Sequence, residues 1–103
     1  TDILKGKHPV IVEEIWGMIY KEGDYTAVHS HWPCIWSGVY YVKISKALEG
    51  GELHFSELKQ NIIPKEGMLV LFDSYLKHEV LKLHGEGERI AVSFNIAPSS
   101  NIT

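Results

Sequence analysis

The sequence predicts an all-β sandwich, and three observations favour that fold class. Short runs rich in β-branched and aromatic residues recur along the chain, and residues with turn chemistry, mainly glycine and proline, separate them. Helical periodicity is weak throughout. With 103 residues, 45% of them hydrophobic and 22% charged, the chain has the size and composition of one globular unit. We therefore expect residues 1–103 to form a single domain.

Nine segments have strand character when the chain is followed from its beginning. They are Val10–Val12, Ile15–Tyr20, Tyr25–His31, Ser37–Ile44, Glu52–Phe55, Asn61–Ile63, Met68–Phe72, Glu79–Leu83 and Arg89–Ile96. The expected turns are Lys21–Asp24, Gly50-Gly51, the P-x-x-G segment Pro64–Gly67 and the glycine-bearing His84–Glu88. Lys43–Leu48 fits one helical turn, and the last seven residues are expected to fray.

Charge and cysteine content exclude several classes of function. The net charge of −3 provides no broad basic field, so nucleic-acid binding has no compositional support. The longest apolar run, Met68–Phe72, is far shorter than the roughly 20 residues of a membrane span, and no secretory leader is expected. A single cysteine, Cys34, fits a reducing compartment and predicts a cytoplasmic protein. The chain begins at Thr1 without Met, which fits a fragment or a trimmed chain.

Histidines provide the strongest chemical signal in the sequence. In His29-Ser30-His31 the two imidazoles are at positions i and i+2 of a predicted strand, so they project to one face and can meet one metal ion. His78 follows His31 by 47 residues, a separation that can return the chain to a neighbouring antiparallel strand. Three imidazoles on one side of an iron or zinc ion leave positions open for oxygen or water.

Three other histidines are weaker candidates. His54 follows a glycine turn and is the alternative third ligand, because its strand can point either way. His8 and His84 lie in segments with turn character, and both are expected to face solvent.

The last predicted strand carries two chemically different faces. One face carries Arg89, Ala91, Ser93 and Asn95. The other face carries the apolar set Ile90, Val92 and Phe94, which is expected to pack a core. The first set forms either the solvent face of an edge strand or the floor of a polar pocket, and the nearby histidines favour the pocket. Arginine binds a carboxylate through two parallel charge-assisted hydrogen bonds, and a serine hydroxyl adds a further donor.

These pieces together resemble the 2-oxoglutarate- and Fe(II)-dependent oxygenases, in particular the prolyl-hydroxylase-like branch and its small phage and marine-bacterial members. The resemblance covers about Ile15 to Ile96. Its motifs, in order, are His29-Ser-His31-Trp-Pro, Ser37-Gly-Val-Tyr-Tyr-Val, Gly50-Gly-Glu-Leu-His-Phe, Pro64-Lys-Glu-Gly67 with Leu-Val-Leu-Phe, His78, and Arg89-Ile-Ala-Val-Ser-Phe-Asn95. It implies a double-stranded β-helix, or jelly roll, as in cupins, and a dioxygenase that couples decarboxylation of 2-oxoglutarate to hydroxylation of a C–H bond.

The resemblance also assigns residues. His29 and His78 correspond to the first and last iron ligands, Arg89 to the residue that pairs with the far carboxylate of 2-oxoglutarate, and Ser93 and Tyr41 to residues beside that cosubstrate. Most members have Asp or Glu where this chain has His31. The small phage-type group tends to carry His-x-His too, so the implied metal set is His29, His31 and His78. Three neutral imidazoles would leave the iron one positive charge richer.

Two alternatives stay open. Gly23, followed after five residues by His29-x-His31, also opens the first cupin motif, which predicts a cupin-type metalloprotein that uses no 2-oxoglutarate. However, Trp32–Trp36 contains no glutamate and no histidine follows Gly67 closely, as a cupin requires. A jelly-roll binding module without turnover is the other alternative. The sequence does not identify the substrate, and edge pairing with a second copy would give a homodimer.

Overall fold

The computed structural model describes residues 10–30 and 35–98, and this part of the chain is built from strands and turns without a helix. In chain order the strands are β1 (Val10–Tyr20), β2 (Thr26–His29), β3 (Trp36–Ile44), β4 (Leu48–Gly50), β5 (Leu53–Phe55), β6 (Gln60–Ile62), β7 (Leu69–Asp73), β8 (His78–Val80), β9 (Leu83–Gly85) and β10 (Arg89–Pro98). Within the described ranges no helical segment has the length and hydropathy of a membrane span.

Two four-stranded antiparallel sheets face each other. The larger sheet has the order β1-β10-β3-β7, the smaller has the order β2-β8-β5-β6, and β4 pairs with β9 in a separate ribbon. Successive segments pass between the two sheets, from β1 to β2 to β3 and later from β7 to β8 to β10. This alternation is the jelly-roll topology, and the predicted all-β jelly roll is confirmed.

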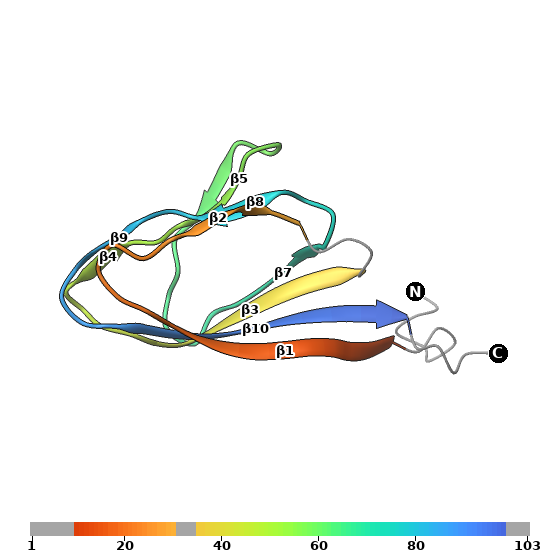
Figure 1. Cartoon of the computed structure of the whole chain (residues 1–103), viewed down its shortest axis with the longest axis horizontal. Coiled ribbons are helices and arrows are strands. Elements are labelled where there is room, and N and C mark those ends of the chain that lie inside the picture. Colours follow the sequence, from red (N-terminus) through yellow and green to blue (C-terminus); the bar gives the residue numbers. More distant parts are fainter. Residues whose placement is uncertain (1–9, 31–34, 99–103) are drawn as a thin grey trace.

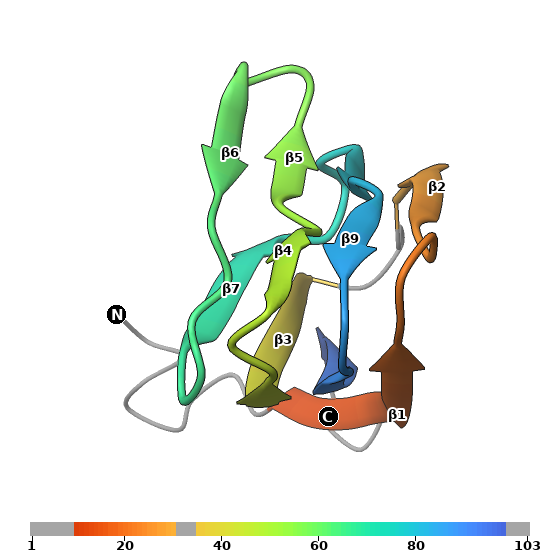
Figure 2. The ribbon, with the colours of Figure 1, turned by 90° about the vertical axis from the view of Figure 1, so that its left-hand side faces the viewer.

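The sandwich is closed at one end and open at the other. In Figure 1 the sheets converge at the β4–β9 ribbon and diverge toward the far ends of β3, β7 and β10. Figure 2 shows β5 and β6 as a hairpin that extends beyond the rest of the smaller sheet. Side chains that point between the sheets are therefore enclosed near β4 and β9 and become accessible toward the open end.

The strand register determines which side chains of the larger sheet point inward. Met18 on β1 lies opposite Ala91 on β10, and Ala91 lies opposite Tyr41 on β3. These inward residues meet Leu53 and Phe55 of the smaller sheet in the main hydrophobic cluster. Burying such side chains contributes about 1.5–3 kcal/mol each, so this cluster contributes much of the fold's stability.

Several local expectations need correction. Val10–Val12 and Ile15–Tyr20 are one strand with an irregularity between Val12 and Glu14. Glu79–Leu83 is two short strands, β8 and β9, rather than one. The helical turn expected at Lys43–Leu48 is absent from the structure. Strand β3 continues to Ile44, and the N–H of Leu48 donates to the carbonyl of Ser45 at 3.0 Å, which closes a β-turn. Of the last seven residues, the first two belong to β10 and the rest lie outside the described ranges.

Candidate metal centre and anion pocket

Strands β2 and β8 bring two distant histidines together. His29 ends β2, His78 begins β8, and the two residues are direct partners in the antiparallel register. Their ring centroids are 4.3 Å apart with the ring planes inclined by 56°. Two imidazoles this close can direct their nitrogens at one ion, as metal-binding histidine pairs do.

Hydrogen bonds to the backbone fix the orientation and tautomer of both rings. Nδ1 of His29 donates to the carbonyl oxygen of Ala27 at 2.7 Å, and Nδ1 of His78 donates to that of Leu76 at 2.9 Å. A carbonyl can only accept, so the proton lies on Nδ1 and the lone pair on Nε2. Metal-binding histidines are held in this way by a bond from their second nitrogen.

Aromatic rings surround His78 on its protein side. The Phe72 ring meets the His78 ring edge-on with centroids 4.7 Å apart, and Phe55 packs against Phe72 at 4.9 Å in the same T-shaped manner. His78 is only 5% exposed, whereas His29 is half-buried and lies nearer to solvent. The aromatic contacts therefore hold the His78 ring in one rotamer.

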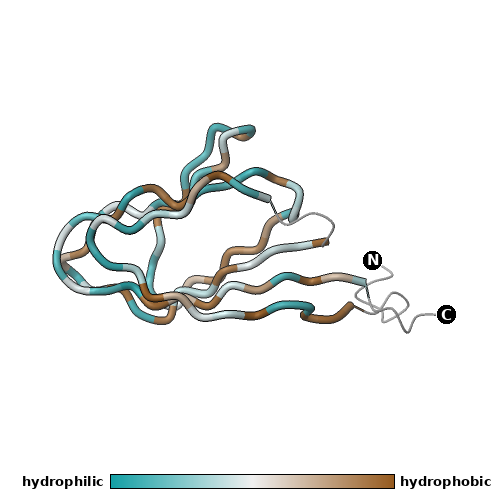
Figure 3. Tube along the Cα trace, in the orientation of Figure 1, coloured by the Kyte–Doolittle hydropathy of each residue, from teal (hydrophilic) through white to brown (hydrophobic). Residues whose placement is uncertain are grey.

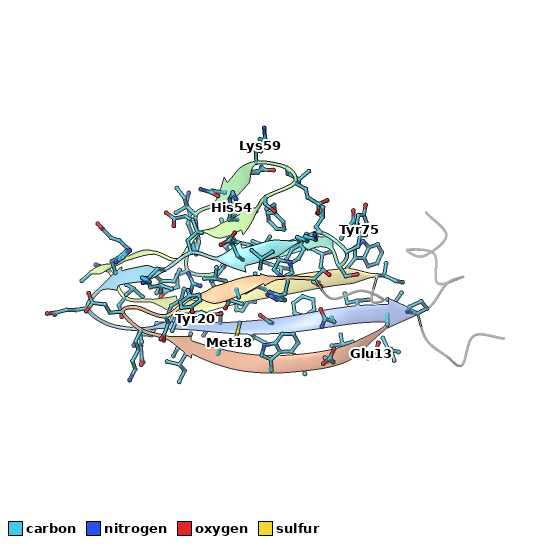
Figure 4. The ribbon with its side chains drawn as sticks, turned by 45° about the horizontal axis from the view of Figure 1, so that its top comes forward. Glu13, Met18, Tyr20, His54, Lys59 and Tyr75 are labelled. Carbon is cyan, nitrogen blue, oxygen red and sulfur yellow. The ribbon has the colours of Figure 1, made fainter. Side chains whose placement is uncertain are left out.

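His31, the expected third imidazole, lies outside the described residues, as do His8 and Cys34. Within the described ranges, no group of three metal-binding side chains is found. His54 belongs elsewhere: its neighbours Leu53 and Phe55 are buried, and its own Nδ1 bonds to Asn61 across the β5–β6 hairpin. His84 is exposed, as expected. Figure 4 shows His54 on the projecting hairpin, away from Tyr20 and Met18 on β1.

Arg89 is buried at the closed end of the same interior. It is 2% exposed, and its Nη1 donates to the carbonyl of Gly51 at 2.7 Å. Its Nε is buried without a hydrogen-bond partner among the described residues. The guanidinium carbon lies 4.8 Å from the ring centroid of Tyr20 and 5.3 Å from that of Tyr41. Cation–π contacts on two sides stabilise the charge only partly, because each is worth about 0.5–2 kcal/mol.

Burial changes the acid–base behaviour of this cluster. It lowers the pKa of Arg89, although Tyr41, Tyr20 and Glu52 act in the opposite direction. It also raises the pKa of Tyr41, with the nearby Arg89 acting in the opposite direction. Arginine remains charged in proteins even so, and a neutral tyrosine hydroxyl can donate a hydrogen bond. The pair is therefore one fixed cation beside one neutral donor, a combination suited to an anionic group.

Strand β10 turns its polar face inward, which resolves the two interpretations of that strand. Arg89, Ala91 and Asn95 are buried, and Ser93 lines the interior with them. The apolar set Ile90, Val92 and Phe94 was expected to pack the core, but all three side chains are only half-buried and none belongs to the hydrophobic clusters of the described residues. The interior favours the polar face because it surrounds a cavity rather than a solid core.

One cavity joins the two groups of residues. It has a volume of about 120 Å³ and is lined by both histidines, Arg89, Tyr41 and Ser93. Its walls are otherwise largely apolar, with Trp16, Met18, Leu53, Phe72 and Val80 among the lining residues. A mostly apolar pocket with a few convergent polar groups is the usual form of a small-molecule site.

Sequence reasoning missed three features of this cavity. Tyr20 contacts Arg89 and its hydroxyl bonds to Thr26 at 2.5 Å. Gly51 supplies the carbonyl that holds Arg89. Ser37 donates to Asn95 at 2.8 Å at the opposite end of the lining. The alternation of Trp16, Met18 and Tyr20 within the predicted strand Ile15–Tyr20 was the available signal.

Comparison with known proteins identifies the family. A family described as "Putative 2OG-Fe(II) oxygenase" matches residues 14–63 and 58–95, most of the chain. The chain therefore belongs to this 2-oxoglutarate–Fe(II) oxygenase family. A search of curated proteins finds no match to the chain.

Solved structures confirm the fold. A 2OG-Fe(II) oxygenase-family oxidoreductase from Burkholderia pseudomallei superposes with a TM-score of 0.77 at 14% identity, covering 87% of this chain and 46% of that one. The viral collagen prolyl hydroxylase of Paramecium Bursaria Chlorella virus-1, in its 2OG complex, gives 0.70 at 24% identity, covering 90% and 62%. This chain thus spans less than two thirds of either protein.

Cupins share the fold less closely but at similar length. An RmlC-like cupin from Desulfovibrio desulfuricans superposes with a TM-score of 0.57 at 14% identity, covering 88% of this chain and 84% of the cupin.

Proposed function

We propose that this protein is a dioxygenase that uses Fe(II) and 2-oxoglutarate to hydroxylate a substrate. The observation that carries the proposal is the buried guanidinium of Arg89, whose Nε has no hydrogen-bond partner among the described residues and which shares a cavity with a histidine pair. A buried charge is costly unless a counter-ion compensates it. The site is therefore built for an anionic ligand.

The residues present fit both the metal and the cosubstrate. His29 and His78 would bind the iron through Nε2, because both Nδ1 atoms are engaged by the backbone. His31, outside the described residues, is proposed as the third ligand. Arg89, with Tyr41 and Ser93, would receive the far carboxylate of 2-oxoglutarate at the closed end of the cavity, where an arginine fork matches carboxylate geometry.

When both are bound, the iron would supply the oxidation chemistry. O₂ would oxidise 2-oxoglutarate to succinate and CO₂, with one oxygen atom entering succinate and the other inserted into a C–H bond of the substrate. The chain's own residues bind and orient. Arg89 fixes one end of the keto acid by charge, and the Tyr41 hydroxyl donates to the same carboxylate. The apolar side chains of Phe72 and Leu53, which line the same cavity, would limit the water in it and so strengthen electrostatic contacts there.

Turnover of 2-oxoglutarate tests the function. Incubated with Fe(II), O₂ and a reductant, the protein is expected to convert 2-oxoglutarate to succinate slowly even without its substrate, as followed by NMR. An exposed-surface variant, Tyr75→Ala, should match the wild type, because Tyr75 is 61% exposed and lies outside the cavity lining. If iron and 2-oxoglutarate both bind yet no succinate forms, the protein is a binding module. If iron binds but 2-oxoglutarate does not, the cupin alternative is favoured.

Gly51 provides a sharper test of how Arg89 is positioned. Gly51 has φ +67°, and a Cβ there would lie 2.5 Å from Nη1 of Arg89 and 2.8 Å from Leu83. Gly51→Ala is therefore expected to displace the guanidinium and weaken 2-oxoglutarate binding at least about 10-fold, measured by calorimetry with Mn(II) in place of iron.

The matched control is Gly67→Ala. Gly67 has φ +83° but nothing within 4 Å of its would-be Cβ. Both variants carry the backbone strain of a left-handed alanine, about 1–2 kcal/mol, so only the first should affect the anion site. Equal loss of 2-oxoglutarate affinity in the two variants would contradict the proposed role of Arg89.

A further inference from the structure

The open end of the cavity carries a network of hydrogen-bonded polar side chains. The hydroxyl of Ser37 donates to Oδ1 of Asn95 at 2.8 Å, and Nδ2 of Asn95 donates to Oε1 of Glu14 at 3.1 Å. Ser37 is 2% exposed and Asn95 is 1% exposed, and both line the cavity, whereas Glu14 is exposed. Two buried polar side chains therefore lead from the cavity wall to one accessible carboxylate.

The strand register places this network in one row across the larger sheet. Glu14 lies beside Asn95, Asn95 beside Ser37, and Ser37 beside Phe72. The Phe72 ring in turn contacts the His78 ring, with the centroids 4.7 Å apart. The row therefore lies next to the histidine pair, where a substrate has to be held if one of its C–H bonds is to be hydroxylated.

The network and the anion site lie at opposite ends of β10. Asn95 follows Arg89 by six residues, which is about 20 Å along a strand. In Figure 3 a hydrophilic stretch lies near the start of β1, at the open end of the sandwich. Figure 4 shows Glu13 at this end of β1, with Met18 and Tyr20 further toward the closed end. A keto acid held by Arg89 therefore leaves the Asn95 end of the cavity to the substrate.

The groups at this end complement a cation that donates hydrogen bonds. The carboxylate of Glu14 only accepts, and Ser37 can only accept from a ligand because its one hydroxyl proton is used in the bond to Asn95. Trp16, the next inward residue of β1, lines the cavity and offers an aromatic face that attracts cations. Arg89, at the far end, is the only lysine or arginine among the described residues that line this cavity.

We propose that the substrate carries a protonated amine, which binds to Glu14 and Ser37 beside the Trp16 ring. This assignment rests on the proposed dioxygenase function. The two ends of the cavity then carry opposite charges, the guanidinium of Arg89 for the keto acid and the carboxylate of Glu14 for the amine. Complementary charge favours the correct ligand at each end and repels the other one. The cavity therefore distinguishes cosubstrate from substrate by charge.

NMR titration of the protein loaded with 2-oxoglutarate and diamagnetic Zn(II) in place of iron tests this proposal. The probes are n-butylammonium and 1-butanol, which have the same number of non-hydrogen atoms and differ in charge. The wild type is expected to bind n-butylammonium at least about 5-fold more tightly than 1-butanol, because an ion pair and a cation–π contact are added. The indole N–H signal of Trp16 should shift during the titration.

Glu14→Gln removes the charge but keeps an oxygen that can accept from Asn95. It is expected to weaken n-butylammonium binding about 3- to 5-fold and to leave 1-butanol binding unchanged, since Glu14 is exposed and its ion pair is screened. Glu86→Gln is the matched control. Glu86 is an exposed glutamate in the turn between β9 and β10 and does not line the cavity, so this variant should bind both probes as the wild type does.

Three results would overturn the proposal. They are equal affinity of the wild type for the two probes, n-butylammonium binding that Glu14→Gln leaves unchanged, and an equal loss in Glu86→Gln. Failure of the proposed function is seen separately, because it appears as a wild type that does not bind the metal and 2-oxoglutarate. The same titration of the metal-free protein then still tests Glu14, since neither histidine nor Arg89 belongs to the network. A loaded protein that fails the amine titration loses only the assigned substrate class.

Discussion

Replacing His78 by alanine is expected to lower the affinity for Fe(II) at least about 100-fold while the sandwich stays folded. Loss of a partner that only orients a ligand already costs 10–100-fold in metal proteins, and His78 is proposed as a ligand itself. Its ring lies 4.3 Å from that of His29 and is fixed by the Leu76 carbonyl and the Phe72 ring. Anaerobic Fe(II) titration followed by metal analysis of the desalted protein measures the effect.

His54→Ala is the matched control for that variant. His54 is on the adjacent strand β5 and also uses its Nδ1 in a hydrogen bond, but it is half-buried where His78 is buried, and it does not line the cavity. It should keep wild-type metal content. Circular dichroism and thermal unfolding show whether His78→Ala is folded, because removing a buried ring costs some stability. A folded His78→Ala protein with full metal content would refute the assignment.

Arg89→Met is expected to weaken 2-oxoglutarate binding about 30- to 4,000-fold without unfolding the protein. Removing one partner of a buried charge pair typically costs about 2–5 kcal/mol of binding energy. The ligand-free protein behaves differently, because the Nε of its buried guanidinium has no hydrogen-bond partner among the described residues. Replacing such a cation by an apolar side chain is often neutral or stabilising, so the melting temperature should not fall by more than a few degrees.

Calorimetry and thermal shift with added 2-oxoglutarate distinguish the two effects. Wild-type protein is expected to gain stability with the ligand, whereas Arg89→Met should gain almost none. Arg89→Lys, which keeps the charge but loses the planar fork, should fall between them. An Arg89→Met protein that is strongly destabilised yet binds 2-oxoglutarate normally would make Arg89 a structural residue.

The fold class could be predicted because strand and turn chemistry are local. Ser37–Ile44 and Arg89–Ile96 contain enough β-branched and aromatic residues to identify β3 and β10 within a few positions. The β4–β9 ribbon could not be predicted, since three-residue strands carry no periodicity and are stabilised by pairing with each other. The segment Ser45–Leu48 was predicted as a helical turn because a β-turn and a single helical turn both bring residues three positions apart close together.

Part of the site could also be predicted. The i and i+2 spacing identified His29, and the distance along the chain suggested His78, which the register places directly opposite it. The structure also brings Arg89, Tyr41 and Ser93 to the same cavity. Tyr20 and Gly51 were missed because their contacts with Arg89 depend on how distant strands meet.

The orientation of β10 shows the limit of alternation as a guide. Alternation separates two faces correctly, but which of them is internal depends on the surroundings. In this protein the polar face of Arg89 and Asn95 lines a cavity, whereas Ile90 and Val92 of the apolar face do not line it. The cavity on the inner side of the sheet therefore inverts the usual pattern.

The central claim is that the histidine pair and the buried arginine bind one metal and one keto acid together in a single cavity. Anaerobic absorption spectroscopy tests it most directly, since 2-oxoglutarate that chelates Fe(II) gives a visible metal-to-ligand charge-transfer band. The band should appear only when both are added, saturate at one equivalent of each, and be absent in His78→Ala and Arg89→Met at matched concentrations. Saturating Fe(II) and 2-oxoglutarate without any band in the wild type would contradict the account.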